Sequence, residues 1–162
     1  QCLVGSEMCI RDSSMPVLGR ITPYLGALPL PDDRGAMKHF LEALTWHTDC
    51  GDCIMIYPEA HIWPFYTGIR PFPDTSFRYP VQQKLPVFCL TNTYQRRGKS
   101  HIPQIVTYLD GPFYPDAELP AKLQKTQLRD QVYEAMGKRA QNSNMEMICY
   151  IKKDTDREKS FI

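Results

Sequence analysis

The chain has 162 residues, of which 43% are hydrophobic and 23% charged, which is typical of a globular domain with one sizeable core. Its formal net charge of +1 gives no electrostatic reason to expect a nucleic acid partner. No window of about 20 apolar residues exists, so the sequence predicts no membrane-spanning helix, although such a protein can still lie on a membrane. Six cysteines lack the spacing of a disulfide framework, and a reducing cytoplasm is therefore the expected compartment.

The start of the chain contains an unusual string, MCIRDS, at residues 8–13. This string resembles the translation of a transposon mosaic-end adapter used in sequencing libraries. We therefore expect residues 1–13 to be a non-native, adapter-derived segment and exclude them from the fold prediction. Under this hypothesis the natural protein extends further upstream, residues 14–141 are a domain fragment, and residues 142–162 are a C-terminal tail. The alternative is a genuine polar N-terminal tail.

Between residues 15 and 57 the sequence predicts one helix and one strand. Prolines at positions 16, 23, 29 and 31 rule out a long helix early in this stretch. After the capping candidates Asp32 and Asp33, apolar side chains recur at helical spacing, which predicts a helix of about 12 residues ending near Trp46. These side chains are Met37, Phe40, Leu41 and Leu44. The apolar run Cys53 to Tyr57 predicts a strand that is buried on both faces.

The rest of the chain predicts a long loop, two more strands and a helix. Residues 58–80 form a loop rich in proline and aromatic residues, and loops of about 20 residues are often functional. The apolar runs at residues 85–90 and 104–109 predict core strands joined by a basic, hairpin-like connection, with a stop at Asp110-Gly111-Pro112. Apolar spacing predicts a helix over roughly residues 117–141. Strands without alternation, separated by helices, predict an α/β fold with a mostly parallel sheet and helices on both faces.

Two further patterns are interpreted as ordinary surface. The basic clusters at residues 96–99 and 152–153 are expected to be a solvated loop and tail rather than lipid or phosphate sites. Cys50 and Cys53 have the spacing of a redox pair or half a zinc site, but they precede a strand, and only His47 is nearby as a further ligand type. They are interpreted as a loop, and thiol chemistry is kept as a weaker hypothesis.

Glu59 is the first candidate for a functional residue. Pro58 cannot donate to a strand ladder, so it releases the backbone directly after the predicted strand. In α/β sheets, ligands bind in the crevice beyond the carboxyl ends of the strands. We therefore expect Glu59 to project into such a crevice. The alternative is a solvent-facing loop glutamate.

The order of these segments resembles the glycerolipid acyltransferase family, which includes 1-acyl-glycerol-3-phosphate acyltransferase. Tyr57-Pro58-Glu59, followed by Pro71-Phe72, is similar to the family's third motif, a buried strand ending in Phe-Pro-Glu-Gly-Thr-Arg and a later Pro-Phe. Residues 84–88, with the sequence KLPVF, are similar to the Val-Pro-Val core of the fourth motif.

Two more segments match in the correct order. Leu18-Gly19 and Gly26-Ala27-Leu28 are similar to the second motif, in which a glycine leads into a short strand. Residues 109–112 match a later strand that ends in a Gly-Pro turn before a helix. The resemblance covers roughly residues 16–136.

The resemblance implies a glycerol-3-phosphate acyltransferase-like fold, incomplete at its N-terminus, and a transferase of phospholipid biosynthesis. Such an enzyme moves a fatty acyl group to a hydroxyl of a lysophospholipid or glycerol phosphate. The donor is an acyl carrier protein thioester, acyl-CoA or acyl phosphate, and no metal or other cofactor is implied. The expected location is cytoplasmic, peripheral on the inner membrane face, with the membrane surface as a partner and no nucleic acid.

The first motif of the family, a His, four intervening residues and an Asp, supplies the general base. No such pair precedes Gly19, so the resemblance implies that this chain contains no catalytic residue and is inactive by itself. His47 and Asp52 have the right spacing, but they fall between the second and third motifs. His47 is therefore interpreted as a histidine at a helix end near solvent.

The expected substrate-binding residues are Glu59, His61, Arg70 and Arg34. Ile62 stands where the family's third motif has an arginine, and the second-motif arginine falls near Pro31 and Asp32. None of these can grip a phosphate by bidentate hydrogen bonds.

Replacements for the two missing arginines can be named. Arg70 and Arg34 are candidates, His61 is a further donor to a phosphate, and Glu59 is expected to organise the acceptor. The alternative for Arg70 is a structural ion pair with Glu59 or Asp74. A second function hypothesis is a non-catalytic module on the same fold that binds lipid or a partner through its aromatic loop.

Overall fold

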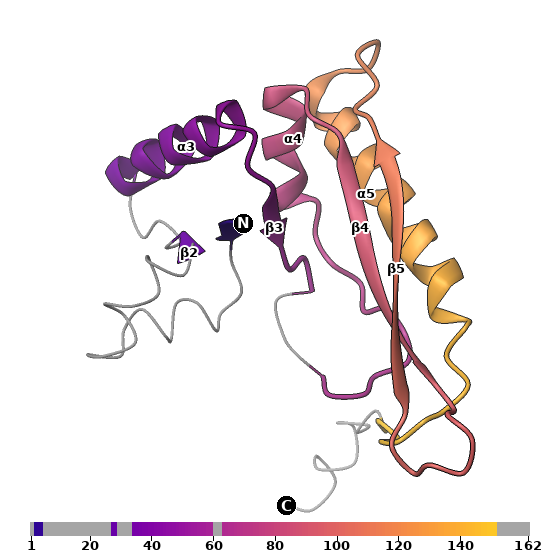
Figure 1. Ribbon diagram of the computed structural model, residues 1–162. Helices are drawn as coiled ribbons and strands as arrows, with labels where there is room; N and C mark the ends of the chain where they lie inside the picture. The colour runs from indigo at the N-terminus through magenta and orange to yellow at the C-terminus, as the bar shows by residue number, and fades with distance from the viewer. Residues whose placement is uncertain (1, 5–26, 29–33, 60–62, 152–162) are drawn as a thin grey trace, which may run out of the picture.

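A computed structural model describes residues 2–4, 27–28, 34–59 and 63–151 of the chain (Figure 1). Its elements, in chain order, are β1 (Cys2–Val4), β2 (Ala27–Leu28), α3 (Arg34–Asp49), β3 (Ile54–Ile56), the 3-10 helix η2 (Thr75–Phe77), α4 (Arg78–Gln83), β4 (Val87–Gln95), β5 (Gln104–Phe113) and α5 (Ala121–Ala140). The described strands form two separate sheets, one with the order β2-β1-β3 and one with β4 beside β5.

The longest strands, β4 and β5, form a two-stranded antiparallel ribbon. Side chains alternate along β4, with Cys89, Thr91 and Thr93 buried and their neighbours exposed. Helix α5 lies along the buried face of this ribbon (Figure 1). It contributes Leu128 and Val132, which are four residues apart and therefore share one side of the helix. Among the described residues, the ribbon is thus covered on one face only.

The main core lies between α5, the ribbon and the segment that precedes α4. Its buried members are Phe72, Phe77, Cys89, Leu128, Val132 and Met136. A smaller core lies where α3 meets β3, because Phe40 and Leu44 of α3 pack against Ile54 and Ile56. The helical spacing of the apolar residues in α3 directs this face of the helix toward the strand.

The second sheet is parallel but small. Strand β1 lies in its centre, with Leu3 opposite Ala27 on one side and Met55 on the other. Strand β3 is therefore an edge strand of this described sheet. Its three side chains are only half-buried.

The expected fold, a mostly parallel sheet with helices on both faces, is wrong. The long strands are antiparallel, since the eight residues between Gln95 and Gln104 are too few for the crossover of a dozen or more residues that parallel strands need. The parallel strands have only two or three residues each. The run at residues 85–90 looks uniformly apolar, but side chains alternate in burial over residues 88–93, with Phe88 and Leu90 exposed and Thr91 and Thr93 buried.

Several individual elements lie where the sequence predicted them. The helix after residue 33 is confirmed, although it continues to Asp49. A strand at residues 54–56 is confirmed, but its expected burial on both faces is wrong. Strand β5 continues through Asp110 to Phe113 instead of stopping, and α5 begins at Ala121, directly after Pro120.

Some positions named in the sequence analysis lie outside the described residues. They fall at residue 1 and within residues 5–26, 29–33, 60–62 and 152–162, and they include Leu18-Gly19, Asp32-Asp33 and His61-Ile62.

The burial of Leu128 gives a test of the core. Leu128 has no exposed surface, so Leu128→Ala should lower the free energy of unfolding by about 3 kcal/mol through lost burial and a residual cavity. Urea denaturation followed by circular dichroism measures this loss. Leu123→Ala on the same helix is the matched control, because Leu123 is 52% exposed, and it should cost no more than about 0.5 kcal/mol. Equal losses in the two variants would contradict this packing of α5.

Candidate functional site

Glu59 and Arg70 meet at the start of the loop that follows β3. The Arg70 Nη2 donates a hydrogen bond of 2.6 Å to the backbone carbonyl oxygen of Glu59, and its Nε lies 3.9 Å from the Glu59 carboxylate oxygen Oε2. Both side chains are mostly shielded, with exposed fractions of 15% for Arg70 and 26% for Glu59. The guanidinium therefore closes an eleven-residue stretch of loop onto the residue that lies just beyond the parallel strand.

Trp63 covers the other side of the Arg70 guanidinium. The guanidinium carbon lies 4.6 Å from the centre of the Trp63 ring, a distance that gives a cation–π attraction. Trp63 also stacks on Tyr150, with 4.9 Å between the ring centres, and meets Tyr66 edge-on. Tyr150 in turn donates a hydrogen bond of 2.8 Å to the Pro64 carbonyl oxygen. The C-terminal segment thus helps to hold the loop.

Helix α5 fixes the other end of this loop. Phe72, two residues after Arg70, is buried in the main core and packs against Phe77 and Tyr133. Arg129 Nη1 donates to the Phe72 carbonyl oxygen at 3.4 Å. These contacts hold the backbone at Phe72, two residues after Arg70. The core therefore restricts the positions that the Arg70 guanidinium can reach.

Burial raises the pKa of the Glu59 carboxyl above its ordinary value, because the charged form loses water. A hydrogen bond from the Arg70 backbone amide, and then the positive charge of its guanidinium, oppose this rise in pKa. The net direction is upward. A shielded carboxylate beside one cation is a type of environment that is common in binding and active sites.

The alternative ion pair of Arg70 with Asp74 is not formed. The Asp74 carboxylate accepts hydrogen bonds from Lys125 Nζ at 3.2 Å and from Thr126 Oγ1 at 2.9 Å. The Thr126 hydroxyl is the largest cause that lowers the pKa of Asp74, and Lys125 adds to it. The pairing of Arg70 with Glu59 is the one that is observed.

The four expected substrate-binding residues are not all brought together. Glu59 and Arg70 are in contact. Arg34 begins α3, but its side chain is not described, and His61 lies outside the described residues.

His47 forms a pair with Asp52, but this pair is not part of the site of Glu59. The His47 Nδ1 lies 2.8 Å from the Asp52 carboxylate. Both residues precede β3, whereas Glu59 follows it, so the strand separates the pair from Glu59 (Figure 1). The pair closes the turn at the end of α3, which agrees with the interpretation of His47 as a helix-end residue.

Cys50 and Cys53 are exposed free thiols in the same turn. In the described part of the chain, no three His, Cys, Asp or Glu side chains gather closely enough to hold a metal ion.

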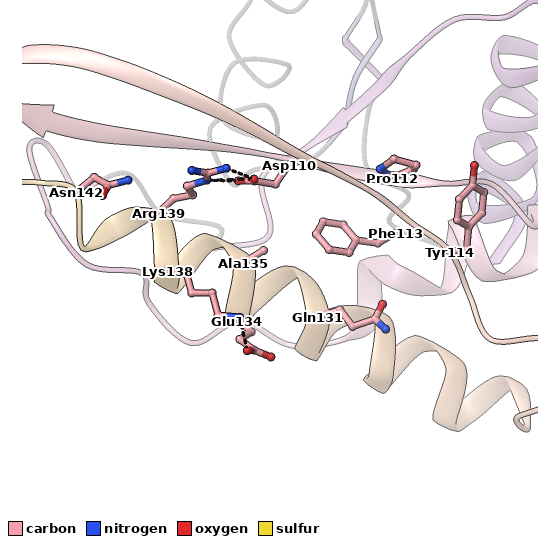
Figure 2. A pocket seen from close by; sticks show the side chains of 10 residues that line it. All are labelled: Asp110, Pro112, Phe113, Tyr114, Gln131, Glu134, Ala135, Lys138, Arg139 and Asn142. Atoms are coloured by element: carbon pink, nitrogen blue, oxygen red, sulfur yellow. Dashed lines mark hydrogen bonds and ion pairs between the residues drawn. The ribbon is translucent and has the colours of Figure 1, made fainter.

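A hollow of about 650 Å³ lies on another part of the molecule, between the end of β5 and α5 (Figure 2). Its cations are already paired: Arg139 makes a bidentate hydrogen bond to Asp110, and Lys138 lies 2.7 Å from Glu134. Neither Glu59 nor Arg70 lines it. Nothing in the sequence pattern pointed to this hollow, because Asp110 was interpreted as part of a turn.

Comparisons of the chain with models of known protein families, with curated proteins and with solved structures found no match. None of the described helices is both long and apolar enough to pass through a bilayer.

The contact between Arg70 and Glu59 predicts a change in titration. Arg70→Gln removes the guanidinium charge that stabilises the carboxylate, so the pKa of Glu59 should rise further. The chemical shift of the Glu59 side-chain carboxyl carbon, followed against pH, measures this. Arg97→Gln, on an exposed turn, is the control and should leave the Glu59 titration unchanged. A pKa of Glu59 that stays the same in Arg70→Gln would show that the pair does not interact in solution.

The same pKa shift determines a pH dependence of stability. Because the folded-state pKa of Glu59 is raised, its contribution to stability is fully present below the unfolded pKa, which is about 4.3. That contribution is lost as the pH rises through the raised folded value. Glu59→Gln cannot titrate, so the free energy of unfolding should fall less steeply over this window in the variant than in the wild type. Identical pH profiles would contradict the burial of the carboxylate.

Proposed function

We propose that the chain is part of an acyltransferase that moves a fatty acyl group to a hydroxyl of a lysophospholipid or glycerol phosphate. One observation carries the proposal: the shielded Glu59–Arg70 pair lies just beyond the carboxyl end of strand β3. Pro58-Glu59 after this strand and Pro71-Phe72 at the end of the loop are the residues that resemble the family's third motif. Arg70, which directly precedes Pro71, contacts Glu59, so the two segments that carry this resemblance lie close together.

Arg70 is the proposed anchor for the acceptor phosphate. A guanidinium has five N–H donors, and in the described residues the Arg70 guanidinium forms only one hydrogen bond, to the Glu59 carbonyl oxygen. Charge-assisted hydrogen bonds between a guanidinium and a phosphate are strong and directional. Glu59 holds the guanidinium and orients the glycerol hydroxyl, and His61 and Arg34 are the further proposed donors.

The proposed reaction is a simple acyl transfer. The acceptor hydroxyl oxygen attacks the acyl carbonyl, a new ester C–O bond forms, and the C–S bond of a thioester or the C–O bond of an acyl phosphate breaks. A histidine base takes the proton from the hydroxyl and returns it to the leaving group. Under this proposal the His-Asp pair lies upstream of Leu18 in the complete protein, and the residues of this chain position the acceptor. The proposed location of the complete protein is peripheral, on the inner membrane face.

A substitution at Glu59 tests the proposed site. In the complete gene product, Glu59→Ala should lower the rate of acyl transfer to lysophosphatidate at least about tenfold, or about 1.4 kcal/mol, because the acceptor loses its orienting group. The assay should offer acyl carrier protein, coenzyme A and acyl phosphate donors in turn. Lys122→Ala, an exposed residue on α5, is the control and should retain full activity. A Glu59→Ala enzyme with wild-type activity and an intact fold would remove Glu59 from the site.

A substitution at Arg70 separates binding from chemistry. Arg70→Ala should mainly raise the KM for the phosphate-bearing acceptor, with a smaller effect on kcat, since the phosphate contact is present in both ground and transition states. Steady-state kinetics against acceptor concentration measure this. An unchanged KM would assign Arg70 to loop structure alone. Lipid binding without transfer from any donor would favour the alternative, a non-catalytic lipid-binding module.

A further inference from the structure

The turn between β4 and β5 is rich in positive charge. Arg96, Arg97 and Lys99 are all exposed in this turn, which spans residues 96–103 and contains no Asp or Glu. Within the described residues, no carboxylate forms an ion pair with any of these three cations. The charge therefore faces solvent at the end of the ribbon.

This turn is ordered by its own hydrogen bonds. The Ser100 backbone amide donates to the Arg97 carbonyl oxygen at 3.0 Å, and the Ser100 hydroxyl donates to the Ile102 carbonyl oxygen at 3.1 Å. Gly98 has a positive φ of 55°, a conformation that glycine adopts without steric cost. The turn also exposes 67% of the Ile102 side chain. Cations and an apolar side chain are thus exposed together on a structured turn.

The loop after β3 and the segment after α5 both come close to the turn end of the ribbon (Figure 1). Trp63 and Tyr150 stack on each other, and both remain partly exposed. Phe65 ties their loop to Tyr94, the penultimate residue of β4, with 5.5 Å between ring centres. The backbone amide of Arg96 donates to Asn144 Oδ1 at 2.7 Å, which ties the C-terminal segment to the start of the turn.

We infer that this end of the ribbon docks on an anionic phospholipid bilayer. The cations of the turn would face the lipid phosphates, and Ile102, Trp63 and Tyr150 would lie at headgroup depth, where Trp and Tyr are enriched. The inference rests on the proposed function and deepens it. The Arg70 guanidinium lies over Trp63, so docking would bring this guanidinium next to the bilayer that supplies a lipid acceptor. The binding itself needs no acyl transfer.

The residues favour a bilayer over other anionic partners. A free phosphate would gain nothing from the exposed Ile102, whereas a bilayer would. RNA needs aromatic faces that are free to stack on bases, but Trp63 and Tyr150 already stack on each other. The exposed Ile102 gains from burial in the headgroup region and gains nothing from an RNA backbone.

The direct test is sedimentation of this chain with vesicles in low salt, without an acyl donor. Binding to vesicles of phosphatidylglycerol and phosphatidylcholine should exceed binding to pure phosphatidylcholine at least about tenfold, and salt should weaken it. Arg96→Ala/Arg97→Ala should lower the partition coefficient about 25-fold, at about fivefold per cation. The matched control, Lys38→Ala/Lys122→Ala, removes two exposed cations away from the turn and should change it less than about twofold.

A second measurement tests whether Trp63 lies at the bilayer. The chain has two tryptophans, so Trp46→Phe leaves Trp63 as the only one. Its fluorescence should shift to shorter wavelength with anionic vesicles and be quenched by brominated lipid, and Arg96→Ala/Arg97→Ala should abolish both effects.

Four outcomes would overturn the inference. They are equal binding to neutral and anionic vesicles, equal losses in the two double variants, displacement by millimolar inorganic phosphate, and binding of single-stranded RNA instead of vesicles with the same dependence on Arg96 and Arg97. Because no acyl donor is present, failure of acyl transfer in the complete protein would leave this result unchanged.

Discussion

The packing of α5 against one face of the β4–β5 ribbon is the contact on which the rest of the described structure depends. Leu128 and Val132 bury the inner face of the ribbon, and the same core takes in Phe72 from the loop after β3. Because Phe72 is fixed, the chain two residues earlier is fixed as well. Arg70 can therefore reach back to Glu59 without first ordering a free loop, which would cost conformational entropy.

Two opposing effects act on the Glu59 carboxyl. Burial disfavours its charged form, and the backbone and guanidinium of Arg70 favour it. The pKa of Glu59 is therefore sensitive to a third charged group. A phosphate near Arg70 would offset the guanidinium charge that stabilises the Glu59 carboxylate. This is the physical reason for proposing that the two residues act as one acceptor-positioning unit rather than as separate contacts.

Elements that depend on local sequence were predicted well. Apolar spacing was sufficient for the helix at residues 34–49, and a short apolar run was sufficient for β3. Strand pairing depends on distant residues and was predicted wrongly, although the short connection between β4 and β5 was readable. The alternation in burial along β4 was not readable, because Phe88 and Leu90 are exposed whereas Thr91 and Thr93 are buried.

The candidate site shows the same division. The Glu59–Arg70 pair spans eleven positions and was among the alternatives considered from the sequence. Tyr150 and Pro64 are 86 positions apart in the sequence, and no sequence pattern predicted their contact. Trp63 was recognised as part of an aromatic loop, but its position over Arg70 depends on how α5 and the C-terminal segment hold that loop.

The most direct test of the acceptor-positioning unit is a double-mutant cycle on acyl transfer by the complete gene product. The values of kcat/KM for lysophosphatidate are compared among the wild type, Glu59→Gln, Arg70→Met and the double variant. If the two residues act as a unit, the double variant loses little more than the worse single variant, with a coupling of at least about 0.5 kcal/mol. Strictly additive losses, or no transfer to any phosphate-bearing acceptor in the wild type, would contradict the account.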